Sequence, residues 1–175
     1  MQWWIMLSLV MVLCGCATVP PPPTVDRVVD VERFMGDWYV IAGRFTWFER
    51  QSHNSVERYE LGEDGRIETT FTFRRGGFDG PKKRMNPVGF IHDHETNAEW
   101  RMQFIWPFKA AYLILYLDDD YEYTAIGVPG QRYLWIMARK PEISAAKMEE
   151  IKSYLYSIGY AVNDLEYIPH SWPRE

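Results

Sequence analysis

The sequence predicts an all-β fold: an eight-stranded up-and-down antiparallel barrel with one C-terminal α-helix packed outside. Between residues 31 and 139, eight short runs of strand-forming residues alternate with turn signals. A single segment with helical periodicity follows them. Closing eight consecutive strands into a barrel removes both unpaired sheet edges, and the helix can then pack its apolar stripe against the outer wall.

The eight expected strands are separated by recognisable turns. Asp64-Gly65 is a hairpin signal, and the strand after it alternates apolar and polar side chains. Pro87 indicates an edge or a bulge in the fourth strand, because proline cannot donate to a sheet ladder. The expected strands are residues 38–45, 55–61, 66–74, 84–91, 99–105, 111–117, 121–128 and 133–138.

The expected helix begins after Ser144, a suitable N-cap residue, and ends before Gly159, where a C′ glycine belongs. The strand at residues 111–117 is apolar on both faces, so we expect it to lie beneath the helix. Residues 165–168 are extended and could pair with an edge strand. The helix buries one apolar stripe, formed by Met148, Ile151, Leu155 and Ile158.

The composition limits the partners and the covalent structure of the chain. Its net charge is −5, and basic residues are scattered among acidic ones, so nucleic acid is not an expected partner. Aromatic residues make up 16% of the 175 residues, which is more than one small core needs, so some rings are expected to line a cavity or to stay exposed. The two cysteines, Cys14 and Cys16, lie in the N-terminal segment, so the domain is expected to have no disulfide.

The N-terminal segment has the features of an export signal. Residues 3–13 carry no charge but are too few to span a bilayer, which takes ~20 apolar residues. Gly15-Cys16 resembles the lipobox of bacterial lipoproteins, which implies cleavage before Cys16 and acylation of that cysteine. The alternative is an ordinary cleaved signal with a chance cysteine. By the resemblance, Ala17 after the cysteine implies anchoring at the outer membrane, facing the periplasm.

This interpretation divides the chain into three parts. Residues 1–15 are the expected signal peptide. Residues 16–30 are the acylated cysteine and a tether, stiffened by the prolines at 20–23, which favour polyproline II. Residues 31–175 are the expected barrel domain.

Three segments of that domain resemble lipocalins. Gly36-Asp37-Trp38 resembles the Gly-x-Trp motif that opens the family's first strand. Residues 133–141 resemble the last strand of bacterial lipocalins of the apolipoprotein D type. Residues 118–121 resemble the family's Thr-Asp-Tyr motif, with Asp119 where threonine is usual. The likeness runs from about residue 31 to residue 168.

The resemblance implies structural roles for the motif residues. Trp38 would plug the closed end of the barrel, and Arg139 would lie over its ring in a cation–π contact, worth ~0.5–2 kcal/mol. Gly36 would allow a tight turn into the first strand. The expected barrel-closing set is Gly36, Trp38, Asp120, Tyr121 and Arg139.

Strand alternation predicts which side chains face the barrel interior if Trp38 does. An eight-stranded barrel has room for one small ligand, and the predicted face suits an elongated hydrophobe whose polar end is fixed by hydroxyls. The resemblance implies fatty acids or lysophospholipids. The expected ligand-binding residues are Val40, Ala42, Phe71, Phe73, Met102, Phe104, Tyr112, Ile114, Tyr116, Tyr123, Tyr133 and Trp135.

The predicted function is therefore binding, storage or transport of a hydrophobic ligand, with no cofactor, no metal and no catalytic residue; a homodimer is left open. Two alternatives remain. One is a lipid-modifying enzyme on the same barrel, for which Glu57 is the first candidate residue. The other is a structural envelope lipoprotein with a filled barrel. His92 and His94 are interpreted as part of a solvated loop.

Two apolar segments are expected at the barrel mouth. Residues 47–48 follow the first strand and residues 106–108 follow the fifth, and both contain tryptophan and phenylalanine. One hypothesis is that they touch a membrane and let ligand pass directly between bilayer and barrel.

Overall fold

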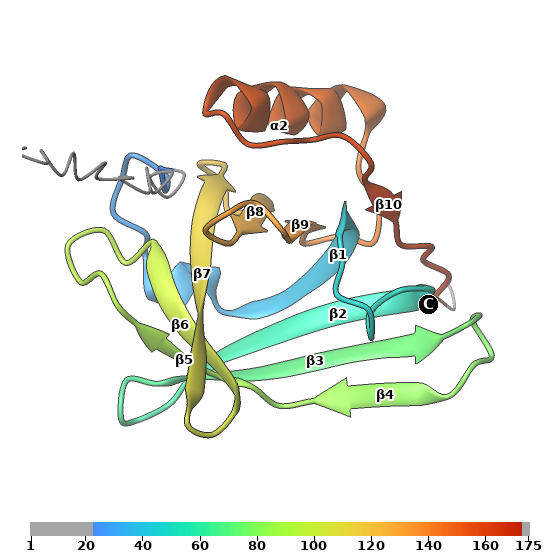
Figure 1. The fold of residues 1–175 in the computed structure, drawn as a ribbon, viewed down its shortest axis with the longest axis horizontal. Helices are drawn as coiled ribbons and strands as arrows, with labels where there is room; N and C mark the ends of the chain where they lie inside the picture. The colour runs from blue at the N-terminus through green and yellow to red at the C-terminus, as the bar shows by residue number, and fades with distance from the viewer. Residues whose placement is uncertain (1–22, 173–175) are drawn as a thin grey trace, which may run out of the picture.

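The computed structural model describes residues 23–172, in which the chain forms the predicted eight-stranded closed barrel (Figure 1). All neighbouring strands are antiparallel, and pairing of the first barrel strand with the last closes the sheet. The barrel strands are β1 (Gly36–Arg44), β2 (Ser52–Leu61), β3 (Ile67–Arg75), β5 (Val88–Ile91), β6 (Glu99–Ile105), β7 (Phe108–Leu117), β8 (Tyr123–Gly127) and β9 (Leu134–Ala138). Cys16 and the expected signal peptide lie outside the described residues.

The fourth expected strand is divided in two at Asn86-Pro87. Its first half, β4 (Lys82–Met85), pairs with the outer part of β3, while β5 pairs with the inner part of β3 and with β6. Asn86 donates to the Thr70 hydroxyl at 2.9 Å, which fixes the break. Among the described strands β4 pairs with β3 alone, so its other edge has no partner strand (Figure 1).

The C-terminal helix α2 (Ala145–Ser157) lies outside the barrel, as predicted (Figure 1). Ser144 accepts the Lys147 N–H at 3.2 Å, and Gly159 has a positive φ of 78° after the last turn. Beyond the helix, β10 (Glu166–Tyr167) pairs with β1. The apolar stripe packs in a second core, on the outer faces of β1, β7, β8 and β9, through Met148, Ile151 and Leu155.

A short helix that the sequence analysis missed, α1 (Val31–Phe34), precedes β1. Asp30 caps it by accepting the Arg33 N–H at 3.1 Å. The segment before it also packs on the barrel: the Val25 N–H bonds to Ile114 O at 2.9 Å, and Val25 and Val29 are buried in the main core. The packed part of the chain therefore starts before residue 31, within the segment expected to be a tether.

Two β-bulges change which side chains face inward. One lies between Val40 and Ala42 in β1, and the other between Ile114 and Tyr116 in β7. A bulge adds one residue to a strand and so reverses the alternation beyond it. The prediction that Ala42 and Tyr116 face the interior is therefore wrong, because both lie on the outer side, against the second core. The prediction for Tyr123 is also wrong: it pairs with Ala138 in the regular β8–β9 ladder, and both residues lie against the second core.

The closed end of the barrel is held by Arg139. Its guanidinium carbon lies 3.8 Å from the centroid of the Trp38 ring, which is fully buried. The same guanidinium donates to four backbone carbonyls, those of Arg33, Phe34, Asp37 and Tyr121, at 2.8, 3.2, 2.9 and 3.1 Å. One side chain thus joins β9 to β1, α1 and the β7–β8 turn.

The other motif residues support this plug unequally. Gly36 has a φ of 98°, and a Cβ there would lie 3.4 Å from the Arg139 guanidinium. The Tyr121 hydroxyl accepts the Asp30 N–H at 2.9 Å. Asp120 is exposed. The turn is held instead by Asp118, whose carboxylate accepts the N–H groups of residues 122 and 123, each at 2.8 Å.

We expect Arg139→Ala to lower the free energy of unfolding by about 2–4 kcal/mol, because it removes both the ring contact and the carbonyl bonds. Arg139→Lys should fall in between, since lysine keeps the charge but lacks the planar fork. Urea denaturation followed by circular dichroism measures both. Lys140→Ala, an exposed neighbour, is the control. A value for Arg139→Ala within about 0.5 kcal/mol of the wild type would contradict this role.

Candidate ligand-binding site

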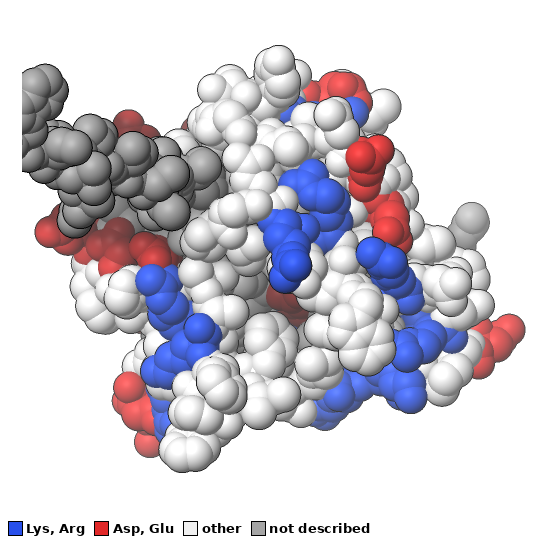
Figure 2. Space-filling model, viewed as in Figure 1, with Lys and Arg blue, Asp and Glu red and all other residues white. Residues whose placement is uncertain are grey.

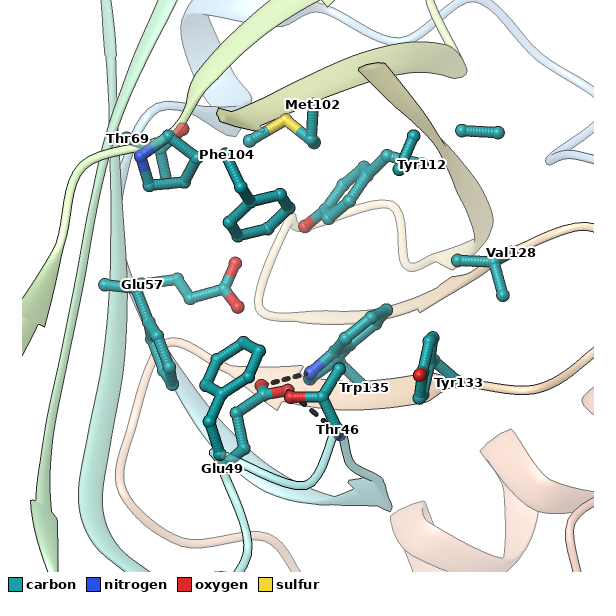
Figure 3. A pocket seen from close by; sticks show the side chains of 15 residues that line it. Thr46, Glu49, Glu57, Thr69, Met102, Phe104, Tyr112, Val128, Tyr133 and Trp135 are labelled. Atoms are coloured by element: carbon teal, nitrogen blue, oxygen red, sulfur yellow. Dashed lines mark hydrogen bonds between the residues drawn. The ribbon is translucent and has the colours of Figure 1, made fainter. Parts of the chain in front are cut away.

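The barrel encloses a cavity of about 240 Å³ between the mouth and the plugged end (Figure 3). The interior is therefore not completely filled by side chains. The cavity is lined almost entirely by apolar groups, with two carboxyl groups among them. The lining residues are Thr46, Phe48, Glu49, Glu57, Thr69, Phe71, Pro87, Met102, Phe104, Ala110, Ala111, Tyr112, Val128, Tyr133 and Trp135.

Half of the expected ligand-binding residues lie on this wall. Three others, Val40, Phe73 and Ile114, belong to the main core inside the barrel but do not reach the cavity. The remaining three, Ala42, Tyr116 and Tyr123, lie on the outside of the barrel. Those on the wall are Phe71, Met102, Phe104, Tyr112, Tyr133 and Trp135.

The turn between β1 and β2 lies at the mouth, where residues 47–48 were expected, but two of its residues were not predicted to line the cavity. Thr46 and Glu49 both line the cavity, although they lie outside any strand. Their three-residue spacing matches a capping box, in which a carboxylate reaches back to the preceding backbone N–H. That spacing is the sequence signal that could have identified the pair.

Glu49 is buried, and its carboxyl group is surrounded by hydrogen-bond donors. It accepts the Thr46 N–H at 3.0 Å, the Thr46 hydroxyl, and the Trp135 indole N–H at 2.8 Å (Figure 3). Burial raises the pKa of Glu49, and these hydrogen bonds oppose the rise. Because Trp135 is on β9, the bonds also fix the turn against the opposite wall.

Glu57 lies at the inner end of the cavity, which we call the floor: Glu57, Tyr59 and Tyr112. Strand pairing places Glu57 opposite Trp38 on β1 and Phe71 on β3. The Tyr59 hydroxyl donates to the Glu57 carboxyl group and lies 2.5 Å from the Tyr112 hydroxyl. The Glu57 carboxyl group points into the cavity (Figure 3).

Aromatic packing ties the floor to the plug. The Tyr59 ring lies 5.7 Å from Phe34 and 5.9 Å from Trp100, and Phe34 lies 5.0 Å from Trp38. Tyr112 stacks on Trp100 at 5.6 Å. Rings packed on both sides cannot rotate freely, so the two hydroxyls are held in fixed positions beside Glu57.

The pKa values of all three floor residues are raised. Burial raises the pKa of Glu57 to about 7, the Tyr59 hydrogen bond opposes the rise, and the nearby Glu49 charge adds to it. Burial and the Glu57 charge raise the pKa values of Tyr59 and Tyr112 well above 10, so both phenols stay protonated.

The mouth combines exposed aromatic side chains with cations. Trp47 is 79% exposed, Trp106 82% and Phe108 75%. Arg75 donates to the Phe48 carbonyl, and the Arg132 guanidinium lies 5.9 Å from the Tyr133 ring. Figure 2 shows a central hollow with acidic atoms at its bottom and Lys and Arg side chains grouped around it. The cavity is thus acidic within and basic at its rim.

Residues 23–172 contain neither a candidate metal-binding cluster nor a helix that could span a membrane. No group of three or more His, Cys, Asp or Glu side chains there could hold a metal ion, and the turn with His92 and His94 forms no such group. None of the helices in the same residues is long and apolar enough to cross a membrane.

Comparisons with known proteins agree with the fold and the motifs. A family profile described as a lipocalin-like domain matches residues 29–170. Outer membrane lipoprotein Blc of Citrobacter freundii is 29% identical over 161 residues, covering 92% of this chain and 90% of the relative. Temperature-induced lipocalin-1 of Arabidopsis thaliana is 30% identical over 161 residues, covering 84% of this chain and 82% of the relative.

Solved structures show the same architecture at low sequence identity. Insecticyanin from the tobacco hornworm Manduca sexta superposes with a TM-score of 0.66 at 16% identity, covering 87% of this chain and 88% of that one. Lobster apocrustacyanin A1 gives 0.65 at 12% identity, covering 82% and 81%. Identities this low support the fold alone.

The raised pKa of Glu57 predicts how stability depends on pH. The folded state holds this proton more tightly than the unfolded state, whose value is near 4.5, so the stabilisation is lost as pH rises from about 4.5 to about 7. We expect the wild type to lose up to about 3 kcal/mol relative to Glu57→Gln over that range. Urea denaturation at a series of pH values measures the difference.

Glu60→Gln, exposed on the outer face of the same strand, is the matched control and should follow the wild type. Parallel pH profiles for the wild type and Glu57→Gln would show that Glu57 titrates normally.

Proposed function

The chain belongs to the lipocalin-like family, and on that basis we propose that its cavity carries one single-chain lipid, a fatty acid or a lysophospholipid, within the cell envelope. The observation that supports this is the enclosed apolar cavity of about 240 Å³. Its volume lies just below the usual range of ligand pockets, ~300–1,000 Å³, and suits one narrow chain better than a bulky ring system.

The charges around the cavity favour one orientation for an anionic lipid. The lining residues include two glutamates and no lysine or arginine. A carboxylate or phosphate is therefore disfavoured inside, and the basic rim at Arg75 and Arg132 is the better place for it. We infer that the acyl chain enters the barrel and an anionic head group stays at the mouth.

Anchoring through Cys16 at the outer membrane completes the proposal. Its support is the lipobox-like sequence, together with the printed description of the Citrobacter relative as an outer membrane lipoprotein. The described segment before α1, residues 23–30, meets the barrel at its closed end, where Arg27 forms an ion pair with Asp119 at 2.6 Å. The exposed tryptophans, Trp47 and Trp106, lie at the opposite end, so the two candidate membrane contacts are spatially separate.

A lipid-modifying enzyme is the second candidate, and one observation favours it. A carboxyl group with a pKa of about 7 in an apolar cavity is suited to general acid–base chemistry, and two phenol hydroxyls lie beside it. We place binding first because the cavity lining, apart from Glu49 and Glu57, carries no charged group and is mostly apolar.

Native mass spectrometry of the protein lacking residues 1–16, with organic extraction, tests the carrier function. We expect one co-purified lipid with the mass of a fatty acid or a lysophospholipid. Ala110→Trp should lose it, because this side chain lies opposite Met102 on the inner face and the tryptophan fills the cavity, whereas Ala146→Trp on the exposed face of α2 should keep it.

The outcomes separate the candidates. An empty protein that also rejects a fluorescent fatty acid would contradict the carrier proposal. A product of altered mass, formed by the wild type and not by Glu57→Gln, would establish the enzyme.

Membrane fractionation tests the anchor. We expect Cys16→Ala to move the full-length protein from the membrane fraction to the aqueous fraction, because acyl chains stabilise attachment by ~0.8 kcal/mol per buried CH₂. Cys14→Ala should stay in the membrane fraction. In the anchor-free protein, replacing both Trp47 and Trp106 with alanine should weaken any remaining vesicle binding. Membrane retention of Cys16→Ala equal to that of the wild type would refute the anchor.

A further inference from the structure

The floor of the cavity presents a carboxyl group that no cation in the described chain neutralises. From β2 and β7 it is faced by the hydroxyls of Tyr59 and Tyr112, and from the β1–β2 turn by the second carboxyl group, Glu49. Its strand neighbours Trp38 and Phe71 carry no charge. The arginine below the floor, Arg139, is occupied by the Trp38 ring and four carbonyls on the other side of the plug.

Glu49 and Glu57 differ in how their charges are met. Glu49 receives two hydrogen bonds from Thr46 and one from Trp135. Glu57 receives a bond from Tyr59 and is within hydrogen-bonding reach of Tyr112, although an ionised carboxylate can accept about four. Glu57 also keeps part of its surface open to the cavity. Its unused acceptor positions therefore face the space that a ligand occupies.

The surrounding rings also suit a positive charge. Tyr112 and Trp135 are stacked with centroids 6.5 Å apart, and both line the cavity above the floor. Cations are attracted to the faces of such rings, most strongly where water is excluded. A carboxylate beside aromatic faces is an arrangement that binds ammonium groups.

We propose that the floor binds the ammonium group of a long-chain amine that enters the barrel nitrogen first. Besides the lipid of the proposed function, the cavity then accepts a second ligand, a single-chain cationic amphiphile: its nitrogen donates to Glu57 and lies against Tyr112 and Trp135, and its chain fills the apolar part of the cavity. This rests on the proposed function, because it uses the same cavity, and it adds a preference for the inner end of the ligand. A fatty acid entering head first would instead bring a second carboxylate against Glu57.

A matched series of ten-carbon ligands tests this preference. The cavity of about 240 Å³ has room for about eight groups of ~30 Å³, so most of the chain of decylamine, 1-decanol or decanoate is enclosed and its last few heavy atoms lie at the mouth. By isothermal titration at pH 8, decylamine should bind about tenfold or more tighter than 1-decanol. Decanoate, which is expected to enter chain first, should gain nothing from Glu57 and should bind more weakly than decylamine. At pH 5.5 Glu57 is protonated, and the advantage of the amine over the alcohol should shrink.

Two variants assign the effect to Glu57. In Glu57→Gln the amine should lose about tenfold in affinity at pH 8, while 1-decanol should stay within about threefold of the wild type. Glu60→Gln, on the outer face of β2, should leave all three affinities unchanged. The wild-type series stands by itself if the variant folds poorly.

Each result has a distinct meaning. Equal affinity of the alcohol and the amine at pH 8, or an amine preference that survives in Glu57→Gln, overturns the amine site and leaves the carrier function standing. Failure of all three ligands to bind, together with failure of a fluorescent fatty acid, overturns both.

Discussion

The barrel depends on the contact between the Arg139 guanidinium and the Trp38 ring. A guanidinium has five donors in one plane, so it can cover an aromatic face and satisfy several carbonyls at its edge at the same time. Here those carbonyls come from α1, β1 and the β7–β8 turn, which are distant in sequence. Closure of the barrel end, the position of α1 and the packing of the aromatic floor all follow from one side chain.

The cavity above the plug shows how a small barrel can keep polar groups in an apolar interior. An uncompensated buried charge is costly, so each carboxyl group has a separate solution. Glu49 is held by donors from its own turn and from Trp135, and in return it pins the turn to the far wall. Glu57 holds its proton up to near neutral pH because burial raises its pKa to about 7. Near that pH the protonated and ionised forms have similar free energies, so a ligand can shift the group toward either one.

Much of the fold could be predicted because strand alternation, turn residues and the helix stripe all indicated the same barrel. The site could be predicted only where strands are regular, which is why Phe71, Met102 and Tyr112 lie on the cavity wall. Bulges leave no signal in a local pattern, so Ala42 and Tyr116 were placed on the wrong face. The hydrogen bond from Trp135 to Glu49 depends on a turn that folds back over the mouth, and the raised pKa of Glu57 depends on burial by several strands at once. Neither property can be predicted from the residues that are adjacent in sequence.

The break at Pro87 leaves one part of the sheet with a free edge beside the cavity. Beyond it, β4 is bonded to β3 alone among the described strands, and Pro87 itself lines the cavity. A strand held along one edge loses fewer hydrogen bonds when it moves than a strand held along both. The sheet can therefore yield at β4 at a lower cost than elsewhere, while the plug and the closed ladder stay intact.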